Sequence, residues 1–509
     1  MKRFLSCILV FVFCLTLVGC KKKPQQIVTH EVPEELSKEL IEVEFWHAMG
    51  QDNQALIAKI IDNFEREYQA MGYNIKVTQT ALGGYETLRD SITSNIASGG
   101  QPTLAQTYPD HVALYMAGDA VRELDSYNKS KWGLGDEEAQ YVDGFFAEGK
   151  IYDEAGTLYS LPFNKSTEVM FYNKTMFEKY GWDVPATWDE VVEVAEAFKQ
   201  TTEYQELVKA GQPVAGFSYD SESNLFITFT QQWGGEYTGL TNSTGTGSEL
   251  KSEAGAGWLL FNNAKSKEAV KFYYDNYKAG NMVTSTFFGS DYSSKAFING
   301  QCVMTLGSSA GAHHNDPSGA FEAGAAICPQ KDTSNPQVIQ QGTNVSLFKC
   351  ADAQEELAGW LFMKYLTNFQ SALIWVTGFE EYTNLAGELI EGKEGTAYFP
   401  IRKDVFNSEE YQSYIDYDLR DEEGNLVYNE DGSVAVDEDN WTLAKESARI
   451  GLGQADSFYT NVAFDGSSIV RDEVGFLVQR ILYNDHSGKN FDEVLDTLYK
   501  DTIRTIIYG

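Results

Sequence analysis

The sequence predicts an α/β fold, and two observations carry this prediction. From residue 41 onward, short segments in which apolar and polar side chains alternate, as in strands, are separated by segments whose apolar residues recur every three or four positions, as in helices. The same order resumes near Tyr159 and continues through most of the chain. Helical connections between successive strands favour a parallel sheet with helices on both faces.

The first region has the order strand, helix, strand, helix, strand. Strands are expected at residues 41–45, 74–80 and 103–107. Two apolar stripes predict the intervening helices: Leu56, Ile60 and Phe64, and then Leu88, Ile92 and Ile96. Asp52 offers an N-cap to the first of these helices.

In the second region, Thr187 and Glu190 have the spacing of a capping box, which predicts that a helix begins there. Further helices are expected at residues 268–278 and 353–366, and a strand at 301–306. No internal repeat of twenty to fifty residues is apparent, so a solenoid is not expected.

The chain begins with an apolar run typical of a secretory signal peptide. Lys2 and Arg3 precede it, and it is too short to span a membrane comfortably. It ends in Leu17-Val18-Gly19-Cys20, which resembles a bacterial lipobox. We therefore expect a signal peptide at 1–19, acylation of Cys20 (a palmitate-type anchor) and a flexible tether over 20–38. The protein would be an extracytoplasmic, membrane-anchored lipoprotein; an uncleaved anchor is the alternative.

The formal charge is −35, from 39 basic and 74 acidic residues. This charge argues against nucleic acid as a partner, since binding its backbone requires Lys and Arg to displace counterions. Hydrophobic residues make up 43 % of the chain, which excludes wholesale disorder. No second long apolar run follows the first, which excludes a polytopic membrane protein.

Three cysteines, Cys302, Cys328 and Cys350, lie in the folded body. Their odd number and the lack of a Cys-x-x-Cys pair favour neither a disulfide framework nor a zinc site. We expect buried small apolar side chains, and one disulfide among the three stays possible.

Residues 403–440 are strongly acidic, with thirteen acidic and two basic side chains. Residues 421–425 and 429–433 each contain a turn sequence followed by alternating apolar residues, which predicts hairpins. A calcium loop is the competing interpretation, but the spacing lacks the full twelve-residue pattern with its terminal Glu.

The motifs of nucleotide hydrolysis, serine hydrolysis and zinc proteolysis are absent from the sequence. His313 and His314 are adjacent, so their side chains diverge on a helix or a strand. We expect no enzyme, no cofactor and no metal site. A carboxylate pair for glycosidase chemistry would be chosen by chance among so many acidic residues.

Aromatic residues lie beside small polar loops, as in Phe45-Trp46-His47 and Gln232-Trp233-Gly234-Gly235. Aromatic faces stack on the apolar face of a sugar ring, while Asp, Asn and Ser bind its hydroxyls. Glycine next to an aromatic residue lets a ligand approach the backbone closely. Carbohydrate binding is therefore favoured, although most single aromatic residues belong to a core.

Several motifs in this order resemble one family. They are Phe45-Trp46-His47, Gly84-Tyr85, Leu161 to Thr167, Phe171-Tyr172-Asn173-Lys174, Pro185 to Glu190, Lys295 to Met304, Gly307-Ser308-Ser309, Gly342 and Tyr398-Phe399-Pro400-Ile401. Over residues 41–500 the chain resembles the extracellular solute-binding proteins of ABC importers, in the branch of the maltose- and glycerol-3-phosphate-binding proteins.

The resemblance implies a two-lobed periplasmic-binding-protein fold with crossing hinge strands and a ligand cleft between the lobes. We expect the first lobe to comprise residues 39–158 and 296–350, and the second 159–295 and 351–509, with the acidic insert at 403–440. Hinge closure on the ligand would then allow docking on the permease.

The resemblance and the aromatic pattern together imply a set of ligand-binding residues. They are Trp46, Tyr85, Asp110, Ser166, Trp233, Ser308, Ser309, Gly342 and Tyr398. The glycerol-phosphate binders use an Arg near the C-terminal helices, and Arg471 does not align with it clearly, so a neutral sugar is preferred.

The sequence thus predicts a monomeric substrate-binding component of a carbohydrate ABC importer, with a membrane permease and the lipid bilayer as further partners. Glycerol-3-phosphate or another polyol phosphate is the alternative ligand. A cell-surface enzyme acting on glycans and an adhesin lipoprotein are alternatives from other classes.

Overall fold

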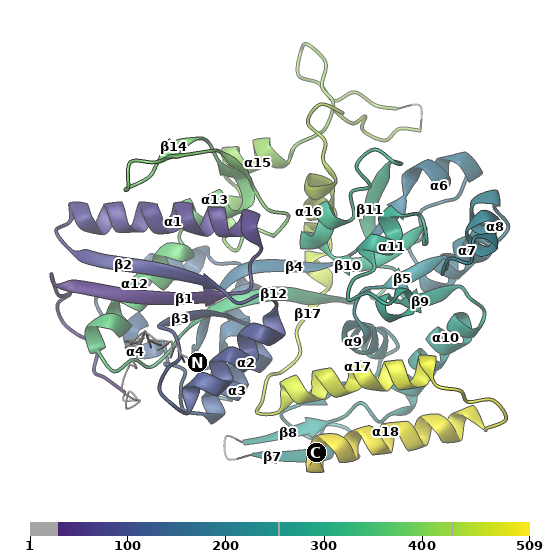
Figure 1. Ribbon diagram of the computed structural model, residues 1–509, viewed down its shortest axis with the longest axis horizontal. Coiled ribbons are helices and arrows are strands. Elements are labelled where there is room, and N and C mark those ends of the chain that lie inside the picture. The colour runs from purple at the N-terminus through teal and green to yellow at the C-terminus, as the bar shows by residue number, and fades with distance from the viewer. Residues whose placement is uncertain (1–28, 253–254, 430) are drawn as a thin grey trace, which may run out of the picture.

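A computed structural model describes residues 29–252, 255–429 and 431–509 and shows two α/β lobes joined by long strands (Figure 1). The predicted α/β class is confirmed. One mixed sheet runs through both lobes in the order β2-β1-β3-β12-β4-β10-β5-β9. The signal peptide and Cys20 lie outside the described residues.

The sheet of the first lobe begins with three parallel strands, as the sequence predicts. They are β1 (Leu40–His47), β2 (Asn74–Ala81) and β3 (Leu104–Thr107). The covering helices are α1 (Gln51–Ala70), α2 (Tyr85–Ile96), α3 (Pro109–Ala117), α12 (Ala353–Leu366) and α13 (Phe369–Thr377). Asp52 lies in the first turn of α1, and the expected N-cap is instead Gly50.

The strands that complete this lobe run the other way, so the parallel pairing predicted for the first region holds for β1, β2 and β3, and the sheet as a whole is mixed. β12 (Val338–Leu347) pairs antiparallel with β3 and with β4 (Ser160–Asn173). Since both strands are long, they extend from the first lobe into the second (Figure 1).

The second lobe surrounds the far half of β4. Its other strands are β5 (Phe217–Tyr219), β9 (Met282–Thr284), β10 (Met304–Ser308) and β11 (Ala323–Ile327). Its main helices are α6 (Lys174–Tyr180), α7 (Trp188–Phe198), α8 (Thr202–Lys209), α9 (Glu222–Gln232), α10 (Ala264–Lys278), α16 (Leu443–Leu452), α17 (Ser467–Tyr483) and α18 (Phe491–Tyr508). The predicted capping box is present: the Thr187 hydroxyl and the Glu190 carboxylate each accept backbone N–H bonds at the start of α7.

Shorter elements connect these. They are α4 (Asp125–Asn128), η1 (Gly135–Gln140), α5 (Asp143–Ala147), η2 (Glu148–Lys150), β6 (Thr238–Gly239), β7 (Ser248–Ser252), β8 (Gly255–Leu259), η3 (Ser285–Phe288), α11 (Ser294–Ile298), η4 (Ser309–His314), β13 (Gly378–Phe379), β14 (Tyr382–Thr383), β15 (Leu389–Ile390), β16 (Lys393–Glu394), α14 (Lys403–Phe406), α15 (Glu409–Ile415), η5 (Ala455–Ser457) and β17 (Phe458–Tyr459).

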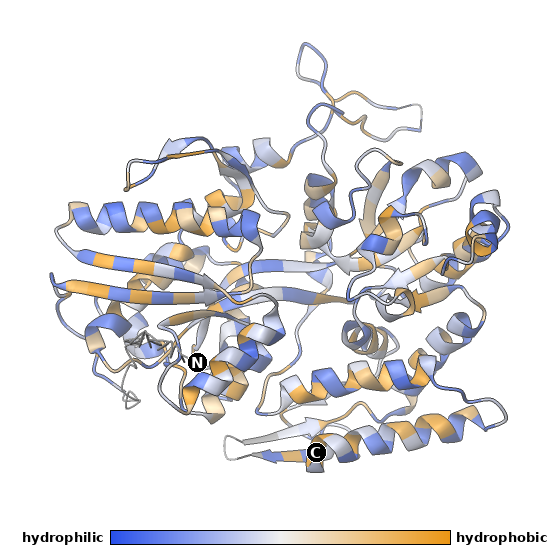
Figure 2. Ribbon diagram, viewed as in Figure 1, coloured by the Kyte–Doolittle hydropathy of each residue, from blue (hydrophilic) through white to orange (hydrophobic). Residues whose placement is uncertain are grey.

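Two large hydrophobic cores correct the expected division of the chain. Residues 296–327 pack with the second lobe, because β10 and β11 pair with the far half of β4. Residues 353–411 pack with the first lobe, where the buried faces of α12 and α13 meet those of α1 and β1. The chain therefore passes between the two lobes at β4, at β12 and again beyond α15. Orange faces of α1 turned toward the sheet mark one of these cores in Figure 2.

The crossing strands approach each other most closely at Gly342, which pairs with Lys165. Gly342 has φ +92°, and a Cβ there would clash with the backbone of Asn164 and Lys165. Glycine is required at this position because it alone tolerates both the left-handed backbone and the contact.

We therefore expect Gly342→Ala to lower the free energy of unfolding by about 2 kcal/mol or more, since overpacking and backbone strain add. Urea denaturation measures this loss. Gly424→Ala is a control for the backbone term alone, because Gly424 has φ +85° with open space around it. Equal losses in the two variants would contradict a close approach at Gly342.

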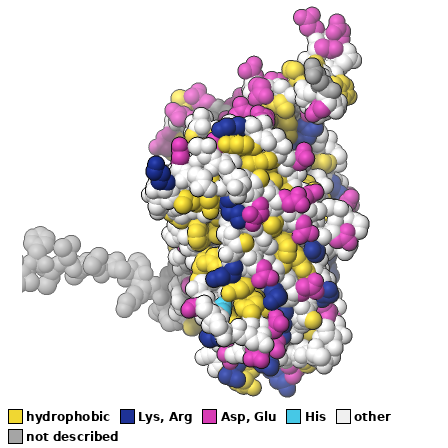
Figure 3. Space-filling model, turned by 90° about the vertical axis from the view of Figure 1, so that its right-hand side faces the viewer, with side chains coloured by type: hydrophobic (Ala, Val, Ile, Leu, Met, Phe, Trp, Pro, Cys, Tyr) yellow, Lys and Arg dark blue, Asp and Glu magenta, His cyan; other side chains and the backbone are white. Residues whose placement is uncertain are grey.

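The acidic insert forms two hairpins that project from the body (Figure 1, top). Bridges join Arg420 to Leu426 and Tyr428 to Val434, as the turn sequences predict. Residues 403–415 are instead helical and pack with the first lobe, so the projecting part begins at residue 416. Its acidic side chains stand out at the top of Figure 3. Among the described residues, no cluster of three or more His, Cys, Asp or Glu has the arrangement of a metal site.

The chain before β1 lies against the first lobe. His30 Nε2 is 3.0 Å from the carbonyl of Cys350, and the Trp132 indole donates to the carbonyl of Pro33 at 2.8 Å. The expected tether over 20–38 is thus wrong for residues 29–38, which are docked. In the described part of the chain no helix is long and apolar enough to cross a membrane.

The three cysteines of the body are free and buried, as expected, and no disulfide joins them. Burial raises the pKa of the Cys302, Cys328 and Cys350 thiols, which keeps them neutral.

Candidate functional site

Three tyrosines of the first lobe, Tyr85, Tyr108 and Tyr398, form a tyrosine cluster at the side of the sheet that faces the second lobe. The rings of Tyr85 and Tyr108 meet edge to face at 5.0 Å, and the Tyr85 and Tyr398 hydroxyls lie 3.5 Å apart. The three side chains are half-buried. Desolvation by burial raises the pKa of all three phenols, so they act as neutral hydrogen-bonding groups with apolar faces.

Helix starts position two of these rings. Tyr85 is the first residue of α2, directly after Gly84, and Tyr108 precedes α3, whose first residue is Pro109. Proline fits the first turn of a helix because its missing N–H would lack an intrahelical partner there. Tyr398 comes from the return of the chain after α13, and its ring stacks on Trp375 at 6.0 Å.

The second lobe contributes a cation. Arg471 lies in the second turn of α17 and is half-buried, and one of its Nη2 hydrogens is donated to Oδ1 of Asn224 on α9. No carboxylate among the described residues is within ion-pair distance of Arg471. This is unusual in a chain of charge −35, and a partly desolvated guanidinium without a carboxylate is suited to an anionic group of a ligand.

Charged groups of each lobe shift the pKa of a tyrosine of the other lobe. Burial raises the pKa of Tyr108, Tyr398 of its own lobe raises it further, and Arg471 of the second lobe lowers it. Burial also raises the pKa of Tyr237 in the second lobe. Arg471 lowers this pKa, and Asp110 of the first lobe raises it. The Tyr237 hydroxyl is buried and has no partner among the described residues.

A polar contact joins α2 of the first lobe to α17 of the second lobe near the tyrosine cluster. Arg89 on α2 donates from Nη1 to the Ser468 hydroxyl at 3.0 Å and to Asp472 Oδ2 at 3.1 Å, both on α17. It also pairs with Asp90 on its own helix at 2.9 Å. Arg89 therefore links the two lobes directly.

We expect Arg89→Ala to weaken ligand binding about fivefold, because closure loses an inter-lobe contact. Titration calorimetry measures this change. Asp90→Ala is the matched control: it removes the contact of Arg89 within the first lobe and should leave affinity unchanged. Equal effects of the two changes would contradict a role for the inter-lobe contact.

The predicted serines lie where β4 and β10 adjoin. The Ser308 hydroxyl donates to the Ser166 hydroxyl at 3.2 Å. Ser309 is buried, and its hydroxyl accepts the backbone N–H of Thr167 at 3.3 Å. Ser309 therefore holds the loop onto β4, whereas Ser308 and Ser166 form a hydroxyl pair.

Of the other predicted residues, three have packing roles and Asp110 lies beside the tyrosine cluster. Trp233 is 7 % exposed, ends α9 and stacks on Phe229 at 5.0 Å, so the predicted sugar-stacking role is corrected to a core role. Gly342 allows the close approach of β12 to β4 described above. Trp46 packs against a small core cluster at the end of β1, and Asp110 lies in the first turn of α3 beside Tyr108.

The structure also adds residues that the sequence did not single out: Asn224, Tyr237 and Glu168. Glu168 has a sequence signal, since it directly follows the Asn164 to Thr167 segment. Arg471, which does not align clearly with the Arg of the glycerol-phosphate binders, lies on α17 of the second lobe, and its charge lowers the pKa of Tyr108 of the first lobe.

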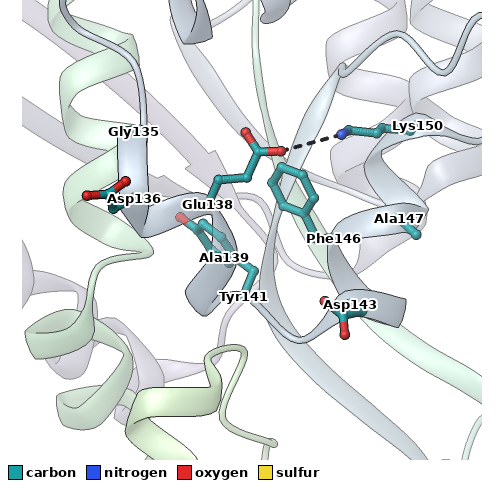
Figure 4. Close-up of a pocket in the computed structure, with 9 residues that line it drawn as sticks. All are labelled: Gly135, Asp136, Glu138, Ala139, Tyr141, Asp143, Phe146, Ala147 and Lys150. Carbon is teal, nitrogen blue, oxygen red and sulfur yellow. Dashed lines mark ion pairs between the residues drawn. The ribbon is translucent and has the colours of Figure 1, made fainter.

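Two pockets lie elsewhere. One of about 500 Å³ is lined by residues 135–150 of the first lobe, and Glu138 and Lys150 pair across it at 3.7 Å (Figure 4). The other, of about 430 Å³, lies behind the crossing strands beside Glu148, Gln340 and Phe458. The tyrosine cluster is the candidate solute site instead, because polar groups of both lobes lie near each other there.

Two α/β lobes, crossing hinge strands and facing polar groups define the class of two-lobed binding proteins. Over residues 50–372 the chain matches the family described as bacterial extracellular solute-binding protein, and it belongs to this family. The recognition made from the motifs is thereby confirmed.

The relatives include both ligand types considered above. The sn-glycerol-3-phosphate-binding periplasmic protein UgpB of Pectobacterium atrosepticum is 25 % identical over 366 residues, which cover 70 % of this chain and 76 % of the relative. The structure of UgpB from Mycobacterium tuberculosis with glycerophosphocholine has a TM-score of 0.64 at 16 % identity, covering 91 % of this chain and 98 % of the other. MalE of Bdellovibrio bacteriovorus bound to maltotriose has a TM-score of 0.61 at 17 % identity, covering 92 % and 100 %.

Proposed function

We propose that this protein is the substrate-binding component of an ABC importer and captures a small polyhydroxylated solute between its lobes. Tyrosine faces and hydroxyls of the first lobe bind the carbon skeleton and its hydroxyl groups. Groups of the second lobe complete the site when the lobes close, and the closed form is recognised by the permease.

Arg471 is the residue that most supports one chemical class of ligand. Its guanidinium has no carboxylate partner in the described chain and faces the tyrosine cluster, so a phosphate ester of a polyol fits best. The sequence favoured a neutral sugar because no Arg aligned clearly with the phosphate-binding Arg of the family. The position of Arg471 on α17 now supports a phosphate ester instead. A neutral sugar remains the second candidate, supported by the three tyrosine rings.

A ligand panel tests both candidates by thermal unfolding and calorimetry. The panel contains sn-glycerol-3-phosphate, glycerophosphocholine, inorganic phosphate, maltose and maltotriose. At a hundred times its dissociation constant, a ligand should stabilise the protein by about 2.7 kcal/mol. Stabilisation by a phosphate ester supports the first candidate, stabilisation by a sugar alone supports the second, and no stabilisation by any member refutes both.

Binding without turnover separates this function from the alternatives. The purified protein should return each ligand unchanged, because hinge closure requires no covalent step. Product formation from a glycan would support a cell-surface enzyme, and binding to matrix proteins without any small solute would support an adhesin. We also propose that the protein acts as a monomer, which light scattering would test.

Membrane anchoring through Cys20 is part of the proposal. The Leu17-Val18-Gly19-Cys20 sequence supports it, and the docked residues 29–38 would then attach the first lobe to the anchor. Cys20→Ala should release the protein from the membrane fraction, measured by detergent partition of labelled cells. Unchanged partition would contradict acylation at this residue.

A further inference from the structure

Arg471 is held by a chain of polar side chains beneath the proposed site. It donates to Oδ1 of Asn224, and Asn224 Nδ2 donates to Oε1 of Glu168 at 2.9 Å. The other carboxylate oxygen of Glu168 accepts the Tyr219 hydroxyl at 2.7 Å and the Thr228 hydroxyl at 3.2 Å. Glu168 is 1 % exposed, so these contacts replace its hydration.

The order of these groups determines whether the Glu168 carboxylate pairs directly with the Arg471 guanidinium. A buried carboxylate and a guanidinium on facing elements would pair directly if nothing separated them, because opposite charges attract strongly away from water. The Asn224 amide lies between them, accepting from the cation on one side and donating to the anion on the other. The guanidinium thus keeps its remaining donors for another partner.

The local structure fixes the amide. Asn224 is in the first turn of α9, its backbone N–H is bonded to the N-cap Ser221 hydroxyl, and its side chain is buried. Glu168 lies on β4 directly after the crossing, paired with Ser308 on β10. The amide and the carboxylate of this chain of contacts are therefore both held by regular secondary structure of the second lobe.

We propose that Asn224 and Glu168 are positioning residues for anion binding: the amide spacer keeps Arg471 from pairing with Glu168 and directs the guanidinium to the phosphate of the ligand. The inference rests on the proposed function, and it assigns a role to two residues that do not touch the solute.

Four forms of the protein test this role, with glycerophosphocholine as the probe because a phosphodiester keeps one charge between pH 5 and 8. Asn224→Ala should weaken binding about tenfold, since Glu168 then captures Arg471. Glu168→Gln alone should keep at least wild-type affinity, because the amide oxygen still accepts from Asn224. The double variant Asn224→Ala/Glu168→Gln should regain most of the loss.

Recovery in the double variant is the decisive readout, because a merely structural role would make two changes worse than one. Gln231→Ala, at the other end of α9, controls for disturbance of the helix, and unfolding midpoints confirm that each variant folds. A double variant that binds as weakly as Asn224→Ala or more weakly overturns the inference. Wild-type protein that binds no phosphate ester overturns the proposed phosphate class and this inference together.

Discussion

Replacing Arg471 by Gln is expected to weaken the binding of a phosphate ester about a hundredfold, which is roughly 3 kcal/mol. The loss is large because the anionic group would be enclosed by the closed lobes without a charged donor, and a charged group buried without its partner is costly. Titration calorimetry with sn-glycerol-3-phosphate measures it. Affinity for a neutral sugar should change far less.

Arg504→Gln is the matched control for this experiment. Arg504 lies on the exposed side of α18, where its side chain is 72 % exposed and pairs with Asp501. It carries the same charge but is solvated, so this change should leave both affinity and stability within experimental error. If the two variants bind the ester equally, Arg471 does not contact the anion and the neutral-sugar candidate takes precedence.

The second large effect is expected at a buried ion pair on the hinge strands. Lys165 on β4 is fully buried and pairs with Glu148, whose other oxygen accepts from Gln340 on β12 at 3.0 Å. Burial lowers the pKa of Lys165, while Glu148 opposes this shift. Lys165→Met should lower the free energy of unfolding by about 3–5 kcal/mol, because Glu148 is left buried without a counter-charge. Urea denaturation measures the loss.

Two further variants separate charge from packing. Lys165→Met combined with Glu148→Gln should lose clearly less than Lys165→Met alone, since no unpaired charge stays buried. Lys403→Met breaks an exposed pair with Asp143 and should cost less than about 1 kcal/mol. A double variant as unstable as the single one would mean that the lysine stem, not its charge, supports the hinge.

Local sequence patterns predicted the elements that depend on near neighbours. The helix at 353–366 and the capping box at Thr187 and Glu190 are found as predicted, because periodicity and capping act over one or two turns. The hairpins of the acidic insert follow from their turn residues in the same way. The family motifs, read in order, gave the two-lobed fold and the solute-binding class.

Local sequence patterns could not predict which segments that are distant in the sequence pack together. The assignment of residues 296–327 depends on strand pairing across more than a hundred residues, and that of residues 353–411 depends on helices that pack against α1 and β1. No local pattern encodes either choice. Trp233 illustrates the same limit at a single residue: an aromatic side chain next to glycines is compatible with a ligand or with a core, and only its stacking on Phe229 decides.

By itself, the sequence determined the α/β class and the kind of binding protein, and it singled out two members of the tyrosine cluster, Tyr85 and Tyr398. Only the tertiary structure brings the charge of Arg471 near those tyrosines. Arg471 lies 363 positions from Tyr108 in the chain, and the packing of the two lobes brings the guanidinium close enough to lower the pKa of that phenol. Because electrostatic interaction depends on distance in space and on burial, the proposal of an anionic ligand rests on the folded chain.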